Sequence, residues 1–213
     1  MIIFKILGFF ICFDIFLVII IKFWQKIQVF LFMCKNCKHY KKIFINGLQV
    51  DMFGDIPEVA LTCFEDIPKK LIYSYSRHNF KVTLLTGSLF YTYATICGRE
   101  DDCVGFFSPY RKEIVLNVND FYFKASLFHE FGHFCDYLKG GLCGYASHID
   151  LDVKEERKEQ FLYSNFYDYY VENDAEFVAF CISEYLCKHQ IPEKMVQIAK
   201  KYLQVSFDDA YVL

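Results

Sequence analysis

Residues 129–133 read His-Glu-Phe-Gly-His, and this pentapeptide constrains the fold more than any other part of the 213-residue chain. Residues four apart on an α-helix lie on nearly the same face, because each helical residue turns by about 100°. A helix here therefore directs His129 and His133 towards one metal ion, with Glu130 beside them. The pattern is typical of a zinc site whose glutamate contacts water rather than the metal.

The surrounding residues favour a buried helix. Residues 121–139 contain no proline and one glycine, and apolar residues occur on nearly every side of the predicted helix. The pair Asn119-Asp120 predicts its start, and Gly140-Gly141 predicts its end. Two core histidines without a metal would give the same pattern, but burying two imidazoles and a carboxylate together without a cation is electrostatically unfavourable.

A catalytic zinc site takes three protein ligands and keeps a fourth position open. Glu176 is the best candidate for the third ligand, because it lies in a second apolar helix, predicted over 174–188, that can pack against the first. His148 is the nearest later imidazole, but its segment is rich in loop-forming residues. A different role for Glu176 is equally open: Asn173 followed three residues later by glutamate resembles a capping box, in which the carboxylate caps its own helix.

Two segments of the chain resemble a known group of zinc proteases. They are HEFGH with Asp136 and Tyr137 after it, and NDAEFVAF at residues 173–180. Together they are similar to the HExxH gluzincins of the anthrax lethal factor and Pro-Pro endopeptidase type, and a looser similarity covers residues 56–190. The resemblance implies a zincin-like metalloprotease domain in which the glutamate of the second segment is a zinc ligand.

The resemblance also assigns roles to individual residues. It implies three ligands for one zinc ion: His129, His133 and Glu176. Glu130 is then the general base, and the hydroxyl of Tyr169 stabilises the developing oxyanion. The predicted reaction is hydrolysis of a peptide bond in a protein or peptide, with no cofactor besides zinc. One position departs from the group's pattern, since Phe180 stands where a second glutamate is usual. A catalytically inactive zincin-fold module that binds or inhibits a partner is therefore the alternative function.

The N-terminal segment is far more apolar than the remainder of the chain. Residues 2–32 are almost all Ile, Phe, Leu or Val, interrupted by four charged residues: Lys5, Asp14, Lys22 and Lys26. The run over 6–21 is long enough to enter a membrane, although Asp14 opposes insertion by a few kcal/mol. Three readings stay open: a membrane anchor, a secretion signal, or an extension upstream of a start at Met33. We expect a secreted or membrane-anchored protein.

Composition narrows the function classes. Hydrophobic residues make up 54% of the chain and aromatic residues 20%, which excludes a disordered protein. The net charge of −3 and the absence of a basic stripe give no reason to expect nucleic-acid binding. We divide the chain into a hydrophobic N-terminal segment with its linker (1–45) and a zincin-like metalloprotease domain (46–213).

The order of the predicted elements indicates an α+β fold. Strands are predicted near 80–86, 90–96, 103–108 and 111–118. Helices are predicted over 57–77, 120–139, 154–170, 174–188 and 192–204. Strands followed by helices suit a small mixed sheet packed on the motif helix, with a C-terminal helical part. That layout aligns a peptide along an edge strand of the sheet.

Overall fold

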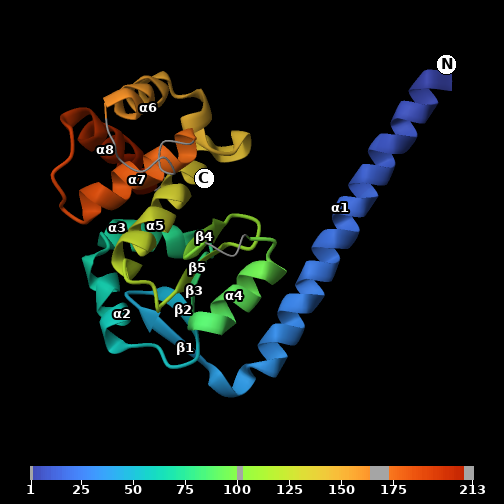
Figure 1. The fold of residues 1–213 in the computed structure, drawn as a ribbon, viewed down its shortest axis with the longest axis horizontal. Helices are drawn as coiled ribbons and strands as arrows, with labels where there is room; N and C mark the ends of the chain where they lie inside the picture. The colour runs from blue at the N-terminus through green and yellow to red at the C-terminus, as the bar shows by residue number, and fades with distance from the viewer. Residues whose placement is uncertain (1, 100–102, 164–172, 209–213) are drawn as a thin grey trace.

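The computed structural model describes residues 2–99, 103–163 and 173–208, and these residues have an α+β fold (Figure 1). Its centre is a five-stranded sheet with strand order β1-β2-β3-β5-β4. The strands are β1 (Tyr40–Ile45), β2 (Leu48–Phe53), β3 (Lys81–Leu85), β4 (Gly105–Ser108) and β5 (Glu113–Asn117). The three inner strands run parallel, while β1 and β4 are antiparallel edge strands, so the sheet is mixed as predicted.

Helices cover both faces of this sheet. They are α1 (Ile2–Lys35), α2 (Glu58–Thr62), α3 (Lys69–Arg77), α4 (Gly87–Ile96), α5 (Phe123–Gly140), α6 (Leu151–Tyr163), α7 (Asp174–Leu186) and α8 (Glu193–Asp208). Four 3₁₀ turns join them: η1 (Cys37–His39), η2 (Cys63–Asp66), η3 (Gly141–Cys143) and η4 (Ala146–Ile149). Helices α3 and α5 pack on one face, and α4 with the end of α1 packs on the other. Helices α7 and α8 lie over α5, which is therefore enclosed between two layers (Figure 1).

Strand residues alternate between two cores, as the period of two in a β-strand requires. In β5, Ile114 and Leu116 belong to the core under α5, whereas Val115 belongs to the core under α4. The first core contains four tightly packed aromatic rings, with centroids 4.8–5.3 Å apart: Tyr75, Phe80, Phe131 and Phe134. Two of these rings belong to α5, so the cluster fixes the motif helix on the sheet.

The predicted continuous helix over 57–77 is wrong. The segment forms two short helices, α2 and α3, separated by the η2 turn. Pro68 accounts for the break, because a proline ring disfavours the helical conformation in the residue before it. Ile67 accordingly has an extended backbone, with ψ of 131°.

The predicted strand near 90–96 is also wrong, because these residues belong to α4. The aromatic and β-branched residues favour a strand locally, but Phe90, Tyr93 and Ala94 are spaced for one face of a helix and are all buried. Burial against the second core therefore outweighs the local preference.

The remaining predicted elements agree with the structure to within a few residues. Strands near 80–86, 103–108 and 111–118 are β3, β4 and β5, and the last helices are α7 and α8. The motif helix begins at Phe123 rather than 120, and Gly141, with φ of +55°, ends it as predicted. The predicted helix over 154–170 corresponds to α6, and its part beyond 163 lies outside the described residues.

The hairpin of β1 and β2 was not predicted. Its turn is Asn46-Gly47, with φ of 53° and 86°, a pair that suits a tight hairpin because both residues tolerate positive φ. The sheet therefore begins at Tyr40, inside the segment that the sequence division assigns to the linker. The division itself stays a prediction, but a fragment that starts at 46 lacks an edge strand.

Helix α1 is the one element among the described residues that is long and apolar enough to cross a membrane, by length and composition alone. The qualifying stretch is Phe13–Lys35, in which Phe32 is the one buried residue. An anchor and a secretion signal both fit this feature.

A buried carboxylate links β5 to β3 and α4. Glu113 is 1% exposed and accepts hydrogen bonds from Tyr93 (3.0 Å), Thr83 (3.2 Å) and the guanidinium of Arg111. Arg111 is its closest cation, and Lys81 Nζ lies 3.8 Å from its other oxygen. Removing one partner of a buried ion pair is strongly destabilising, because it leaves the other partner without compensation.

We expect Arg111→Met to lower the free energy of unfolding by about 3 kcal/mol, because it leaves Glu113 buried without its closest cation. Urea unfolding of the full chain in detergent measures this change. Lys112→Met, at the next position, is the control and should change stability by less than about 0.5 kcal/mol. Equal stability of the two variants would contradict the prediction.

Candidate metal centre

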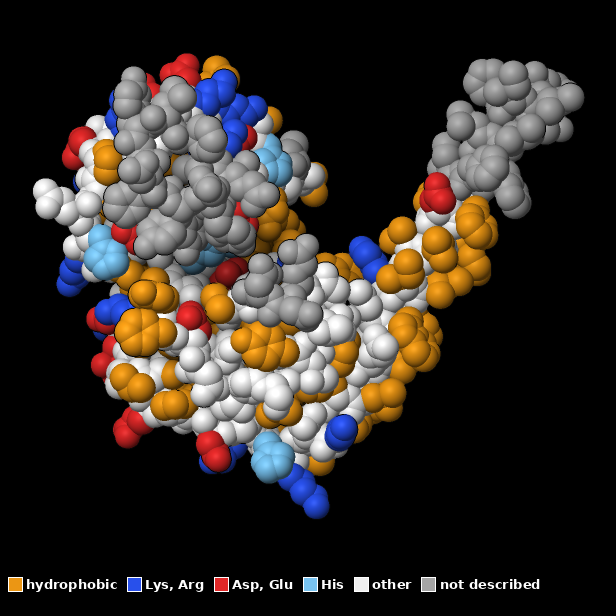
Figure 2. Space-filling view, viewed as in Figure 1, with side chains coloured by type: hydrophobic (Ala, Val, Ile, Leu, Met, Phe, Trp, Pro, Cys, Tyr) orange, Lys and Arg blue, Asp and Glu red, His pale blue; other side chains and the backbone are white. Residues whose placement is uncertain are grey.

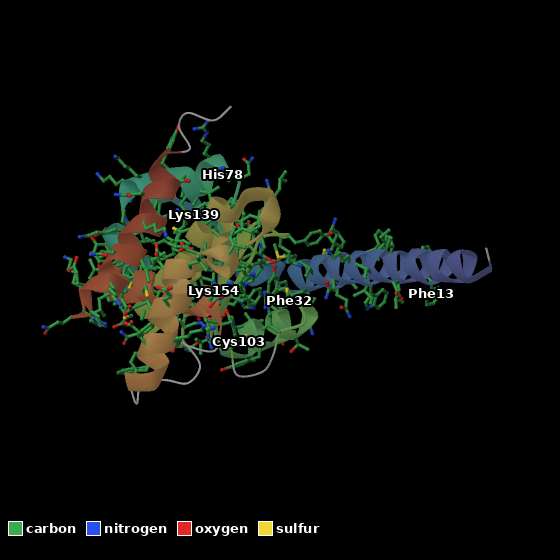
Figure 3. The ribbon with its side chains drawn as sticks, turned by 90° about the horizontal axis from the view of Figure 1, so that it is seen from above. Phe13, Phe32, His78, Cys103, Lys139 and Lys154 are labelled. Atoms are coloured by element: carbon green, nitrogen blue, oxygen red, sulfur yellow. The ribbon has the colours of Figure 1, made fainter. Side chains whose placement is uncertain are left out.

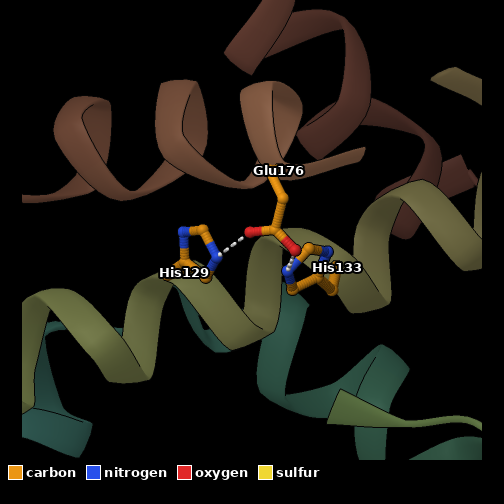
Figure 4. Close-up of side chains that lie close together, drawn as sticks. All are labelled: His129, His133 and Glu176. Carbon is orange, nitrogen blue, oxygen red and sulfur yellow. Dashed lines mark hydrogen bonds and ion pairs between the residues drawn. The ribbon is translucent and has the colours of Figure 1, made fainter. Parts of the chain in front are cut away.

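The two histidines of the motif and Glu176 converge where α5 and α7 cross (Figure 4). His129 Nε2 lies 3.0 Å from Glu176 Oε2, and His133 Nε2 lies 3.4 Å from Glu176 Oε1. The ligand atoms of the three residues lie within 4.8 Å of one another. No other group of three such side chains occurs in the part of the chain that the structure describes. The structure thus brings together the three residues that the sequence singles out.

Asn173 caps α7 without help from Glu176. Its side-chain oxygen accepts hydrogen bonds from the backbone N–H groups of Ala175 and Glu176, each at 3.0 Å. The Glu176 carboxylate turns instead to the two imidazoles. Of the two roles open from the sequence, the structure therefore supports the one in which this carboxylate faces the histidines.

The cluster suits a divalent cation. The side chains of His129, His133 and Glu176 are only 11–18% exposed. Burial by itself raises the pKa of Glu176, but hydrogen bonds with both histidines outweigh it and hold the pKa well below its usual range. Two imidazole nitrogens and a carboxylate form a mixed nitrogen and oxygen donor set. Such a set suits zinc, whereas magnesium and calcium bind mainly oxygen ligands.

Glu130 lies on the side of α5 that faces the sheet edge. It is 6% exposed and accepts a hydrogen bond from the backbone N–H of Phe107 in β4, while its Oε2 has no partner among the described residues. Burial raises its pKa to about 7, and His129 and Arg99 partly oppose the rise. A nearby divalent cation favours the ionised form of such a group.

The edge strand β4 runs directly beside Glu130. A Cβ on Gly105 would lie 3.4 Å from Glu130 Oε1 and 2.8 Å from a methyl group of Leu116, so a side chain there would crowd Leu116 and the carboxylate of Glu130. Phe106 and Phe107 are buried in the two cores, one on each face of the strand. The outer backbone edge of β4, rather than its side chains, therefore faces the site.

Arg99 reaches the same edge from the opposite face of the sheet. Its guanidinium donates a hydrogen bond to the carbonyl of Phe107 (3.2 Å) and lies 5.2 Å from the ring of Phe106. The outward N–H and C=O of Phe107 are thus both engaged, one by Glu130 and one by Arg99. Arg99 was not predicted, because it lies in a polar loop far from the motif and no local pattern marks it.

Gly132 permits the close crossing of α5 and α7. A Cβ there would lie 2.6 Å from Ala179 Cα and 3.0 Å from its carbonyl oxygen, both backbone atoms that cannot move aside easily. Ala179 is one turn after Glu176, so the contact sets how near that carboxylate comes to the histidines. The role of Gly132 was not predicted, although a glycine inside a helix, where it costs about 1 kcal/mol relative to alanine, is a signal.

A buried carboxylate holds the next loop against α5. Asp136 is fully buried and accepts hydrogen bonds from the backbone N–H (2.8 Å) and hydroxyl (2.5 Å) of Ser147. The loop places the ring of Tyr145 6.1 Å from that of His133, in an edge-on contact. His148, the other imidazole considered from the sequence, is exposed and outside the ligand group.

Two further residues singled out from the sequence are Tyr169 and Phe180, and the structure describes the second but not the first. Tyr169, the expected oxyanion donor, lies in the stretch 164–172, outside the described residues. Phe180 is half-buried and packs against the first core, so the position four residues after Glu176 makes apolar contacts rather than supporting a ligand.

Comparison of the chain with protein-family models gives no match, and comparison with curated proteins gives none either. The chemistry of the site therefore has to be inferred from its own residues and geometry.

Gly132→Ala tests the helix crossing. Helix propensity alone would stabilise the protein by up to about 1 kcal/mol. We expect the opposite, a loss of about 1–3 kcal/mol, together with weaker zinc binding, because the methyl group forces the helices apart. Thermal unfolding and zinc titration calorimetry measure the two effects.

Ala179→Gly is the matched control, because it removes a methyl group from the same contact without adding bulk. It should keep zinc affinity within a few-fold of the wild type. Unchanged or raised stability of Gly132→Ala would show that the helices do not need this close approach.

Proposed function

We propose that the protein is a zinc-dependent endopeptidase with a zincin-like fold. The observation that carries this proposal is the convergence of His129, His133 and Glu176, with Glu130 one residue along the helix and buried beside the edge strand β4. Each of these residues has the chemistry that hydrolysis of a peptide bond requires, and the sheet edge offers a place for the peptide.

The metal would be held by two imidazoles of α5 and one carboxylate of α7. Zinc in such a set lowers the pKa of a bound water and polarises a carbonyl group. Since Glu176 already contacts both histidines at 3.0 and 3.4 Å, a modest outward movement of these side chains would make room for the ion.

Glu130 would act as general base and then as general acid. Its carboxylate accepts the proton of the attacking water and later delivers it to the departing amine nitrogen. The hydrogen bond from Phe107 N–H holds one oxygen, and Oε2, which has no partner among the described residues, is the oxygen left for this transfer. Tyr169 remains the proposed donor to the oxyanion, on the basis of the resemblance alone.

The substrate would add a strand to the outer edge of β4. Extended peptides bind sheet edges through backbone hydrogen bonds, which suits an enzyme that must cleave the backbone itself. Gly105 leaves this edge free of a side chain, and the Arg99 side chain would leave Phe107 O when a peptide N–H takes its place.

The second candidate function is an inactive zincin-fold module that binds or inhibits a partner. Phe180 favours it, because side chains that orient metal ligands often decide activity, and an aromatic ring cannot supply that hydrogen bond. Such a module would bind zinc without hydrolysing peptides, so measured cleavage would exclude it.

Glu176→Ala tests the metal site. We expect the full-length wild type to bind one zinc ion, and the variant to lose at least about 100-fold in affinity, because two imidazoles alone are a weak site. Titration calorimetry and metal analysis after dialysis measure this. Glu184→Ala, which removes a carboxylate from the same helix, is the control and should bind zinc normally. Equal zinc content of both variants would exclude Glu176 as a ligand.

Glu130→Gln tests the chemistry. The amide cannot accept the proton, so the rate of peptide-library cleavage should fall by about 100- to 10,000-fold while bound zinc stays at the wild-type level. Chelator should stop wild-type cleavage, and added zinc should restore it. A wild type that holds zinc but cleaves nothing would favour the inactive module.

A further inference from the structure

The exposed part of α1 is apolar on every side. Each residue from 15 to 21 is a large hydrophobic residue, and each is 45–60% exposed. Consecutive residues point all round a helix, whereas a protein groove or a second helix covers only a stripe. Lipid chains surround a helix completely, so a bilayer is the partner that this surface fits.

Helix α1 is docked on the folded domain rather than loosely tethered to it. Phe32 is 6% exposed, with its ring 5.7 Å from that of Phe53 and 5.3 Å from that of Tyr93. Further along the same helix, the ammonium groups of Lys22 and Lys26 lie 4.4 and 5.5 Å from the ring centre of Tyr110. Because the helix is continuous from Ile2 to Lys35, these contacts fix the direction in which it leaves the domain (Figure 3).

The contacts also locate the membrane surface along α1. About 20 helical residues cross the apolar part of a bilayer, and α1, which is helical from Ile2, has room for such a span on the N-terminal side of Lys22. Lysine and tryptophan side chains favour the headgroup region, which suits Lys22, Trp24 and Lys26. The bilayer surface would therefore lie near Tyr110.

A second exposed apolar surface lies next to the metal centre. We call residues 141–151, the segment that follows α5 and ends at the first residue of α6, the apolar loop. Its large apolar side chains are highly exposed: Leu142 (108%), Ile149 (75%) and Leu151 (71%). Figures 1 and 3 show this segment on the side of the domain that faces the N-terminal half of α1, and Figure 2 shows an open notch between domain and helix.

We propose that α1 inserts into a lipid bilayer and that the apolar loop rests on the surface of the same bilayer, so that the metal centre faces the membrane. Tyr145 belongs to this loop and contacts the ring of His133, so loop and site form one surface. If the proposed peptidase function holds, the substrates are peptide segments at the membrane surface, such as the residues that flank a membrane span of another protein.

The membrane contact can be tested without reference to catalysis. Trp24 is the single tryptophan of the chain, so Trp24→Phe gives a silent background for Leu142→Trp. The full-length variant is reconstituted in vesicles whose acyl chains carry bromine, which quenches indole within the bilayer. We expect roughly twofold or greater quenching, as for side chains buried in the interface.

Val59→Trp in the same background is the matched control. Val59 is also exposed (70%) but lies on α2, away from the N-terminal half of α1 (Figure 1). It should show no quenching. If both proteins float with the vesicles and brominated lipid quenches Leu142→Trp no more than Val59→Trp, the proposed orientation is overturned.

A flexible insertion tests whether the docked helix sets the orientation. Gly-Gly-Ser inserted after Lys26 leaves the exposed apolar part of α1 and the packing of Phe32 unchanged. The protein should still float with vesicles, but quenching at position 142 should fall towards the level of the Val59→Trp control. Undiminished quenching would show that the loop binds membrane independently of α1.

The substrate class is tested with one peptide sequence presented in two ways, joined to a lipid by a short linker or free in solution. We expect at least about tenfold faster cleavage of the lipid-linked peptide, and loss of that advantage in the insertion variant. Equal rates would overturn the substrate class. If neither peptide is cut while the quenching pattern holds, the peptidase proposal fails and the membrane orientation stands.

Discussion

The close crossing of α5 and α7 at Gly132 and Ala179 is the constraint on which the rest of the site depends. The histidines belong to one helix and the carboxylate to the other, so no local feature of either helix can bring the three together. Only the separation of the two helices does so, and that separation is set by the absence of a side chain at one position. The candidate metal centre is in this sense a property of helix packing.

The structure supports this crossing from both sides. Beneath α5, the aromatic cluster around Tyr75 and Phe134 fixes the helix on the sheet. Above it, the Asn173 side chain caps α7, which leaves the carboxylate of Glu176 for the histidines. Two further carboxylates of α5 bind neighbouring elements. Glu130 accepts a hydrogen bond from the edge strand β4, and Asp136 accepts one from the loop that carries Tyr145. Each polar group is thus held by a different neighbouring element.

Sequence spacing was sufficient for part of this arrangement. A helix with histidines four residues apart places both on one face. An apolar helix capped by Asn173 has to bury its apolar residues against another part of the domain. The sequence alone could not decide whether Glu176 caps its helix, because that depends on a partner helix whose His129 lies 47 residues earlier in the chain. It also missed Arg99 and the hairpin of β1 and β2. The local residue types favour a strand where α4 lies. Burial of Phe90 and Tyr93 against α1 and β5 makes the segment helical instead, and this long-range packing cannot be read from the local sequence.

Edge strands with apolar residues are prone to pair with other chains, and β4 carries two adjacent phenylalanines. Here the outward backbone groups of Phe107 are already occupied by Glu130 on one side and Arg99 on the other. The strand is in effect self-protected against edge-to-edge aggregation. An incoming strand must form enough backbone hydrogen bonds along Gly105 and its neighbours to displace the Arg99 guanidinium from the Phe107 carbonyl. Brief, non-specific contacts with unfolded chains do not meet this requirement.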